Sequence, residues 1–268
     1  MTTIQMVATD LDGTLLNSHL QISEKNKLAL QRLKRSGVHV VLCTGRPFNG
    51  MVHLIDEIGL DGSDYTVSYN GSLVQTCDGK TILHSASLSP MDFYHISKFF
   101  AKYGLGVHAM SMDKMYTYNS SIHPLTIRES YLGSLPITVL ADKHYVSEPI
   151  IKLMAVGEPK QLDKAIAVFA QVFGNLFSLN KSEAFYLEIM QKGDNKAKAL
   201  KILLDKLQLS SDNLMAFGNN NNDLEMIRLA KVGVAVDNAI TSLKQESDYI
   251  TESNDKDGVA VFLDNYCA

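Results

Sequence analysis

Short apolar runs that end in polar residues recur along the chain, and they constrain its fold more than any other feature. Residues 4–8, 38–43 and 214–217 form three such runs. Runs this short and this uniformly apolar are typical of strands buried on both faces. Helical patterns separate them, as in the segment between Ser23 and Gly37, two residues that suit the start and the end of a helix. Alternating strands and helices predict an α/β fold with a doubly wound, mainly parallel sheet.

The pattern changes between residues 85 and 189. A helix is expected at 90–103 and short strands follow it, and further helices are expected near 125–132 and at 161–173 before a hairpin. Beyond this segment the alternation of strands and helices resumes. We therefore expect one domain made of residues 1–84 and 190–268, with an α+β domain at 85–189 inserted into it.

Charge and composition exclude several classes of function. The chain has 29 acidic residues against 25 Lys plus Arg, a net charge of −4, so a broad basic face for nucleic acid is not expected. No apolar run approaches the roughly 18–20 residues that span a bilayer, and the start MTTIQMVATD lacks the segments of a signal peptide. The cysteines, Cys43, Cys77 and Cys267, are too few and too scattered for a disulfide framework. These features predict a cytoplasmic protein with no membrane or nucleic-acid partner.

Polar residues gather after the predicted strands. Asp10 and Asp12 follow the first run, Thr44 follows the second, and the sequence GNNNND at 218–223 follows the third. Lys196 opens the helix that comes after the inserted segment. Ligands of a doubly wound sheet bind outside the carboxyl ends of its strands, so these side chains are expected to meet. Two carboxylates, a hydroxyl, a cation and a cluster of acid and amide groups predict a phosphoryl-transfer site with a divalent metal.

A carboxylate nucleophile suits that chemistry. With a reference pKa of about 3.9 it is ionised at pH 7 and needs no base, but it meets repulsion from a phosphate dianion in a partly desolvated site. Mg²⁺ and a nearby lysine would cancel that repulsion. The spacing of Asp10 and Asp12 lets both carboxylates point to one side of an extended segment. Asp12 could therefore protonate the leaving oxygen while Asp10 forms an aspartyl-phosphate intermediate.

The order of these motifs resembles that of a known family. DLDGTLL, then LCTGRP, a lysine, and GNNNNDLEM are similar to the motifs of the haloacid dehalogenase (HAD) superfamily of phosphatases, and the long insert resembles the type IIB cap of its Cof-like subfamily. The resemblance covers essentially the whole chain. It implies a Rossmann-like catalytic core at 1–84 and 190–268, with a cap at 85–189 that closes over the site, excludes water and chooses the substrate.

The resemblance also implies a role for each motif residue. Asp10 is the expected nucleophile and Asp12 the expected acid and base. The expected ligands of Mg²⁺, or alternatively of Mn²⁺, are Asp10, the Asp12 carbonyl, Asn219 and, as support, Asp223. The expected phosphate and substrate contacts are the Leu11 backbone, Thr44, Gly45, Arg46, Lys196 and Asn222.

Asn219 departs from the family pattern, which usually has aspartate at this position. An amide oxygen can still bind Mg²⁺, but the site loses one negative charge. We therefore expect weaker metal binding, with Asp10 and Asp223 still supporting the ion.

Structural roles remain open for several of these residues. Asp10 and Asp12 could be turn formers before Gly13, and Thr44 could cap the helix that follows it. Lys196 has other lysines near it, and a lysine run is usually a solvated face. Its place at the start of a helix favours an anion-binding role.

Some residues outside the main motifs have more than one interpretation. Arg46 could contact substrate or pair with a surface acid. The dipeptide Asn70-Gly71 is most simply a hairpin turn, near which substrate could also bind. The inserted segment offers further candidates for substrate contact, with no pattern to show which of them face inward: His108, Tyr116 and Tyr118.

The predicted function is a Mg²⁺-dependent phosphatase of small phosphorylated metabolites that acts as a monomer or weak homo-oligomer. A sugar phosphate is the first expected substrate, and pyridoxal phosphate or a nucleotide-type monoester comes next. A phosphomutase or phosphotransferase is a second hypothesis, because the motifs do not separate water from a sugar hydroxyl as the acceptor. A catalytically silent metabolite-binding regulator is a third, which only Asn219 favours. A nicotinamide-dependent dehydrogenase is disfavoured, because no GxGxxG follows the first strand.

Overall fold

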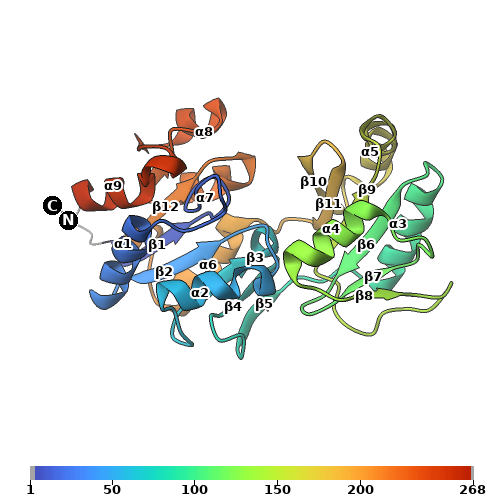
Figure 1. The fold of residues 1–268 in the computed structure, drawn as a ribbon, viewed down its shortest axis with the longest axis horizontal. Helices are drawn as coiled ribbons and strands as arrows, with labels where there is room; N and C mark the ends of the chain where they lie inside the picture. Colours follow the sequence, from blue (N-terminus) through green and yellow to red (C-terminus); the bar gives the residue numbers. More distant parts are fainter. Residues whose placement is uncertain (1–3, 267–268) are drawn as a thin grey trace. The chain divides into compact units, whose positions relative to one another are not determined.

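The computed structural model describes residues 4–266, which form two compact units (Figure 1). Unit 1 contains residues 4–46, 51–84 and 195–266, and unit 2 contains residues 47–50 and 85–194. This division differs from the expected one in two short segments.

Both of these segments belong to unit 2. Residues 190–194 do so because strand β11 (Tyr186–Gln191) continues past residue 189, and Asp194 N then donates to Gln191 O at 3.4 Å. Residues 47–50 were expected in the larger domain and are also grouped with unit 2.

Unit 1 is built on a sheet that, within the described residues, has eight strands in the order β14-β13-β12-β1-β2-β3-β4-β5. Neighbours from β14 to β3 are parallel, and β3 and β4 are antiparallel. The strands are β1 (Met6–Thr9), β2 (His39–Cys43), β3 (Tyr65–Ser68), β4 (Leu73–Thr76), β5 (Ile82–Ser85), β12 (Leu214–Gly218), β13 (Val232–Ala235) and β14 (Tyr249–Ile250). The helices are α1 (Glu24–Arg35), α2 (Val52–Ile58), α6 (Lys196–Lys206), α7 (Leu224–Leu229), α8 (Thr241–Glu246) and α9 (Gly258–Tyr266).

Helices cover both faces of this sheet. Successive strand residues point to opposite faces, and Val7 is as deeply buried as its neighbours Met6 and Ala8. Met6 and Ala8 pack in one core with Leu200 of α6 and Met226 of α7. Helix α1 contacts β2, α2 and α9. The prediction of a doubly wound α/β core is confirmed.

Local signals set the helix ends as the sequence predicts. The Ser23 side chain accepts a hydrogen bond from Asn26 N at 3.1 Å at the start of α1, and Gly37 follows its end with φ +83°. Asn195 caps α6 by accepting from Lys198 N at 2.8 Å. These caps satisfy N–H groups that have no partner within the first turn.

Unit 2 is an α+β layer, as expected. Its described residues contain a six-stranded sheet in the order β10-β11-β9-β6-β7-β8, antiparallel except between β7 and β8. Besides β11, the strands are β6 (Gly106–Met110), β7 (Met115–Thr117), β8 (Ile137–Val139), β9 (Lys152–Val156) and β10 (Phe177–Glu183). The helices are α3 (Pro90–Ala101), α4 (Pro124–Gly133) and α5 (Pro159–Phe173). Side chains of α3 and α5 form an apolar core with one face of the sheet.

The other face of this sheet carries polar side chains next to α4. His108 has 0% exposure, and its Nδ1 lies 3.0 Å from Thr126 Oγ1 of α4. Lys152 Nζ lies 3.0 Å from Glu188 Oε1, and both side chains are buried. The interpretation of His108 as a substrate contact is therefore wrong, because its side chain belongs to the interior of unit 2.

The two tyrosines considered with His108 make contacts inside unit 2. The Tyr116 hydroxyl donates to Glu148 Oε1 at 2.6 Å, and the Tyr118 hydroxyl donates to His144 O at 2.6 Å. These hydrogen bonds give both side chains a structural role.

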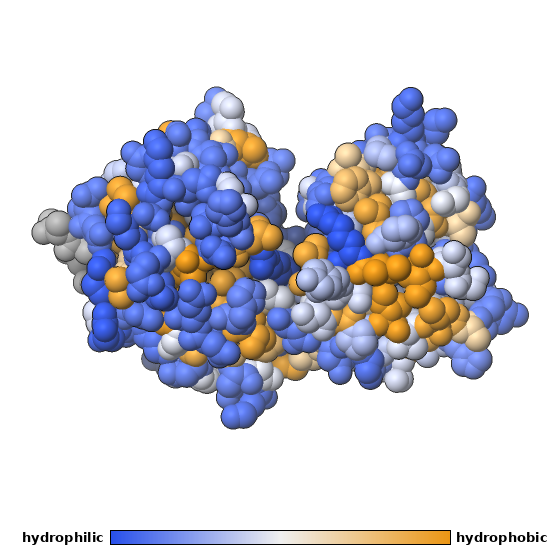
Figure 2. Space-filling model, in the orientation of Figure 1, coloured by the Kyte–Doolittle hydropathy of each residue, from blue (hydrophilic) through white to orange (hydrophobic). Residues whose placement is uncertain are grey.

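Cys43 and Cys77 are free and buried, whereas Cys267 lies outside the described residues. Burial raises the pKa of the Cys43 thiol to about 12, so this thiol stays protonated in the core. Between residues 4 and 266, no helix has both the length and the apolar character to cross a membrane. Figure 2 shows a mainly hydrophilic surface on the displayed face of unit 1.

Candidate active site

The carboxyl ends of β12, β1, β2 and β3 form one edge of the sheet, because these neighbouring strands are parallel. Asp10 follows β1, Thr44 follows β2, and Asn219 follows β12. The backbone hydrogen bonds continue into the loops, with Asp10 N donating to Phe217 O at 3.0 Å and Thr44 N donating to Val67 O at 2.9 Å. The fold thus brings three of the predicted segments to the same edge.

Lys196 joins two of the predicted carboxylates. Its Nζ donates to Asp10 Oδ1 at 2.6 Å and to Asp223 Oδ1 at 2.7 Å. The Lys196 and Asp223 side chains have 0% exposure and that of Asp10 has 7%. Residues 10, 196 and 223 therefore meet in a buried group of two anions and one cation.

Burial and the neighbouring charges both shift the pKa values of this cluster. Burial raises the pKa of Asp10 to about 7, Asp223 adds repulsion in the same direction, and Lys196 only partly opposes them. Burial acts to lower the pKa of Lys196, but the adjacent carboxylates outweigh it and raise that pKa. Lys196 is thus charged, and the cluster has fewer positive charges than its carboxylates would need.

The second oxygen of each carboxylate is also bound. Thr14 Oγ1 donates to Asp10 Oδ2 at 3.0 Å. Asp223 Oδ2 accepts from Asn219 N at 2.9 Å and from Asn220 N at 3.0 Å, which fixes the loop after β12. Thr14 was not among the predicted site residues, although its place in DLDGT marks it as part of the motif.

A glycine is needed where this loop begins. A Cβ on Gly218 would lie 2.5 Å from Cβ of Asp223, closer than real Cβ contacts allow. The glycine therefore lets the Asp223 side chain pack beneath the strand end and reach Lys196.

Asp12 and Arg46 form a bidentate ion pair. Arg46 Nε lies 2.8 Å from Asp12 Oδ2, and its Nη2 lies 2.5 Å from Asp12 Oδ1. The Asp12 side chain is 48% exposed, in contrast to that of Asp10. Of the two interpretations of Arg46, the structure shows pairing with an acid, and that acid is Asp12.

The Leu11 side chain is fully buried, so only its backbone is available to a ligand. Its carbonyl accepts from the N–H groups of Thr14, Leu15 and Leu16 at 3.2, 3.1 and 2.9 Å. These bonds curl the chain after Asp10 into a tight loop.

The turn Tyr69–Gly71 has an unusual backbone, with φ of +50°, +54° and +103° at its three residues. L-residues rarely adopt positive φ, so surrounding contacts must hold this conformation. Tyr69 N donates to Arg46 O at 3.1 Å, and Asn70 N donates to Thr44 O at 2.9 Å. The turn is therefore attached to the loop that follows β2.

The same turn contacts the other site segments. Asn222 Nδ2 donates to Asn70 Oδ1 at 3.0 Å. A Cβ on Gly71 would lie 2.2 Å from Asn195 O and 3.0 Å from Lys196 N, which shows how closely the turn approaches the start of α6. One turn thus touches the segments that carry Thr44, Asn222 and Lys196, a role that its hairpin sequence did not indicate.

Asn219 lies beside the loop after β1. A Cβ on Gly13, where φ is +75°, would lie 2.4 Å from Asn219 Nδ2. Asn238 Nδ2 donates to Gly13 O at 2.8 Å, and Ile240 N donates to Asn219 O at 2.9 Å. Asn238 is a neighbour of the site that the sequence analysis missed, because no motif marks it.

The possible metal donors of the site are oxygen atoms. Among residues 4–266 there is no group of three or more His, Cys, Asp or Glu side chains arranged to hold a metal ion. The predicted set does not need one, since it combines the Asp10 carboxylate with the Asp12 carbonyl and the Asn219 amide. Oxygen donors of this kind fit Mg²⁺, and the shortage of positive charge around Asp10 fits a cation.

Comparisons with known proteins find similarity over nearly the whole chain. A model of the family described as haloacid dehalogenase-like hydrolase matches residues 7–263. A relative from Streptococcus pyogenes, named provisionally as a phosphatase, is 36% identical over 260 residues, which are 96% of this chain and 96% of the relative. The 5-amino-6-(5-phospho-D-ribitylamino)uracil phosphatase of Bacillus subtilis is 30% identical over 257 residues, which are 96% of this chain and 93% of the relative.

Solved structures share the fold of both units. A haloacid dehalogenase-like hydrolase from Bacteroides thetaiotaomicron aligns with a TM-score of 0.89 at 29% identity and covers 98% of this chain and 100% of its own. A subclass IIB sugar phosphatase aligns with a TM-score of 0.80 at 18% identity, covering 98% of this chain and 99% of its own, which is a likeness of fold alone.

Proposed function

The chain belongs to the haloacid dehalogenase-like hydrolases, and we propose that it hydrolyses phosphate monoesters of small metabolites through a phosphorylated Asp10, with Mg²⁺ as cofactor. The observation that carries the proposal is the buried contact of Lys196 with Asp10 and Asp223. A carboxylate held against an ammonium group can approach an anionic phosphate with less repulsion than a carboxylate alone.

Asp10 and Asp12 would divide the chemistry between them. In the first step an Asp10 oxygen bonds to phosphorus, the bond from phosphorus to the ester oxygen breaks, and the leaving oxygen takes a proton from Asp12. In the second step water attacks the phosphorus of the aspartyl phosphate and gives a proton to Asp12, which releases inorganic phosphate and free Asp10. The exposure of Asp12 supports this assignment, because it lets the carboxyl group exchange protons with water.

In this proposal Arg46 has two partners in turn, Asp12 and the substrate. Its guanidinium pairs with the Asp12 carboxylate and would hold it in position to accept a proton in the second step. In the first step Arg46 would contact the substrate instead of Asp12, and Asp12 would then be free to carry a proton.

Phosphoryl oxygens would be held by Lys196, Thr44, Asn222 and the backbone at Leu11 and Gly45. The Thr44 hydroxyl accepts a hydrogen bond from Arg46 N at 3.1 Å, so its own proton is available to a phosphate oxygen.

Asp10, the Asp12 carbonyl and Asn219 would hold Mg²⁺, with Mn²⁺ as the alternative and Asp223 in support. The site supports this assignment because three carboxylates face two cationic side chains in it. When bound, the ion supplies positive charge that reduces repulsion between the nucleophile and the phosphate.

A sugar phosphate is the proposed substrate class. The Bacillus subtilis relative is named for a substrate with a phosphate ester on a ribityl chain, and such a polyhydroxylated chain is chemically close to a sugar phosphate. In this proposal unit 2 is the cap that selects the substrate. A cytoplasmic monomer or weak homo-oligomer completes the proposal, in keeping with the free thiols of Cys43 and Cys77.

The test is phosphate release from a panel of phosphorylated metabolites and an aryl phosphate, with excess Mg²⁺ or Mn²⁺. We expect turnover with the wild type and a loss of about 10³-fold or more with Asp10→Asn at an unchanged melting temperature. Absence of turnover on every compound would instead support a silent metabolite-binding protein. Transfer of phosphate to an added sugar, without release, would identify a phosphotransferase.

A further inference from the structure

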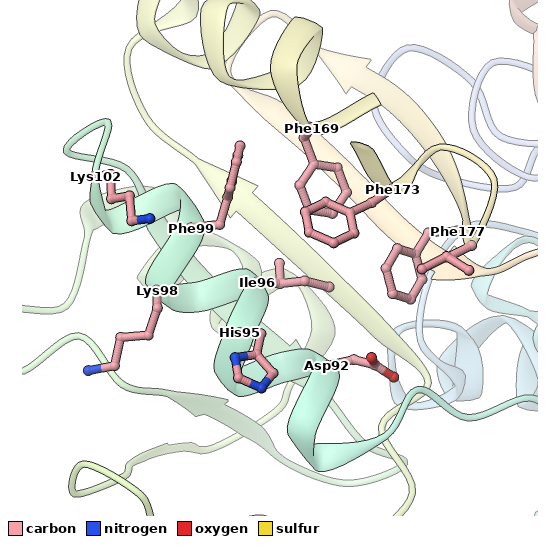
Figure 3. A pocket seen from close by; sticks show the side chains of 10 residues that line it. Asp92, His95, Ile96, Lys98, Phe99, Lys102, Phe169, Phe173 and Phe177 are labelled. Carbon is pink, nitrogen blue, oxygen red and sulfur yellow. The ribbon is translucent and has the colours of Figure 1, made fainter. Parts of the chain in front are cut away.

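Unit 2 contains a cavity of about 380 Å³ beside α3 and α5 (Figure 3). None of the residues that line it belongs to the candidate active site, and its volume is within the usual range of small-molecule pockets, roughly 300–1,000 Å³. The lining residues come from α3 and Lys102 just after it, from α5, and from Leu176 and Phe177 at the start of β10.

Aromatic rings form the apolar part of the cavity. The ring centroid of Phe169 lies 5.3 Å from that of Phe99, 4.9 Å from that of Phe173 and 6.2 Å from that of Phe177. Figure 3 shows the rings of Phe169, Phe173 and Phe177 grouped opposite α3. Phe169 is fully buried, whereas Phe99 and Phe173 are half-buried and present ring surface to the cavity. This surface would gain free energy by covering an apolar ligand.

Helix α3 supplies the charged edge. His95, Lys98 and Lys102 are spaced three and four residues apart, which places them along one side of the helix. Lys98 Nζ is paired with Asp142 at 2.6 Å, whereas Lys102 has no ion-pair partner in the part of the chain that the structure describes. Figure 3 shows the Lys102 side chain turned towards Phe99 and the Lys98 side chain turned away.

The one acid of the edge is already engaged. Asp92 Oδ2 accepts hydrogen bonds from Ser89 N at 3.1 Å and Ser89 Oγ at 2.7 Å in the cap of α3. Asp92 keeps its negative charge but lies ten residues from Lys102, at the opposite end of α3, so the charge beside Phe99 is the positive charge of Lys102.

We propose that this cavity binds an amphipathic monocarboxylate, with its apolar body among the phenyl rings and its carboxylate at Lys102. A cationic ligand would be repelled by Lys102 and Lys98, and a neutral ligand would leave the charge of Lys102 without a counterion. A ligand with several charges does not suit a cavity that has one lysine without a partner. The proposal does not depend on the phosphatase activity.

The test measures binding to the full chain by calorimetry with three ligands that share a ten-carbon chain: decanoate, decanol and decyltrimethylammonium. We expect decanoate to bind more tightly than decanol by up to about fivefold, the effect of one exposed ion pair, and decyltrimethylammonium to bind most weakly. A fourth ligand, 1-naphthoate, distinguishes two kinds of monocarboxylate. Tighter binding of decanoate would identify the ligand as a fatty acid, and tighter binding of 1-naphthoate would identify it as an aryl acid. Equal affinity for the three head groups, or no binding at all, overturns the proposal.

Two substitutions locate the binding. Lys102→Glu should weaken decanoate about fivefold and leave decanol unchanged, whereas the matched control Lys164→Glu, an exposed lysine of α5 outside the cavity, should leave both unchanged. Phe173→Ala should weaken decanoate and decanol alike. Unaltered decanoate binding in both Lys102→Glu and Phe173→Ala contradicts the proposal, and if Phe173→Ala does not fold, the head-group series and the lysine pair still decide.

Discussion

Lys196 binds two carboxylates in a place that is almost entirely shielded from water. A charge is stable there only when it is paired and hydrogen-bonded. The ammonium group therefore has two roles, since it allows Asp10 and Asp223 to remain close together and lowers the negative charge that a phosphate would meet.

Replacing Lys196 should affect stability and activity far more than replacing an exposed lysine on the same helix. We expect Lys196→Met to lower the free energy of unfolding by about 3–5 kcal/mol, because a buried ion pair loses one partner, and to reduce phosphate release about 100-fold or more. Urea unfolding and a phosphate-release assay measure the two effects. Lys201→Met, an exposed position on α6, is the control and should change stability by less than about 0.5 kcal/mol. Equal effects of the two substitutions would be incompatible with the role given to Lys196.

Asn219 allows a test of the metal site. Asn219→Asp adds a negative charge to the proposed donor set, so the Mg²⁺ concentration for half-maximal activity should fall. Titration of the activity with Mg²⁺ measures this concentration. An unchanged or increased requirement would refute the assignment of residue 219 as a ligand.

Among the elements, the turn Tyr69–Gly71 contacts more of the site than any single motif residue does. Its backbone N–H groups bind the loop after β2, its Asn70 side chain accepts from Asn222, and its Gly71 lies against the start of α6. A short element with positive φ at successive residues can thus set the distances between phosphate-binding segments.

Two glycine substitutions can distinguish the cost of backbone strain from the cost of a steric clash with a new Cβ. Gly71 and Gly59 both have positive φ, but a Cβ on Gly59 meets nothing within 4 Å, whereas one on Gly71 meets Asn195 O at 2.2 Å. Gly59→Ala should cost only the left-handed strain, about 1–2 kcal/mol, without loss of activity. Gly71→Ala should cost more and lower kcat, because it displaces Asn195 and with it Lys196. Similar kcat values for the two variants would remove the positioning role of the turn.

On the scale of the whole molecule, the two units bury polar groups for different reasons. Unit 1 buries charged groups at the ends of its strands, where the sequence motifs predict chemistry. Unit 2 buries charged groups beneath α4. Burial lowers the pKa of His108 to about 3, and the positive charge of Lys152 adds to this effect. His108 is therefore neutral in folded unit 2 at pH values where the unfolded chain would protonate it.

The stability of unit 2 should consequently depend on pH. The contribution of neutral His108 is complete above pH 6.5 and is lost as the pH falls towards about 3, since the unfolded chain then binds the extra proton. Each pH unit corresponds to about 1.4 kcal/mol, so unit 2 should lose about 2 kcal/mol between pH 6.5 and pH 5. Urea unfolding at these two pH values measures the loss, and His108→Gln, which cannot titrate, should show a smaller one. The same pH dependence in both proteins would mean that other groups control it.

Much of the fold and the composition of the candidate site followed from the sequence. Short apolar runs and capping residues identify strands and helices because both signals are local. Parallel strands present their carboxyl ends at one edge, so the residues after the runs could be expected to meet there. Asp10, Thr44 and the loop after β12 are found in that arrangement.

Only the tertiary structure decided how the side chains pair. The bond of Asp12 to Arg46, the attachment of Asn70 to Asn222 and the burial of His108 each join segments far apart in the chain. Such contacts depend on how the packed elements are positioned relative to one another, which no periodicity of residues encodes. The cavity of unit 2 arises in the same way, from the fit of two helices, and for that reason the sequence alone specified its phenylalanines but not the space between them.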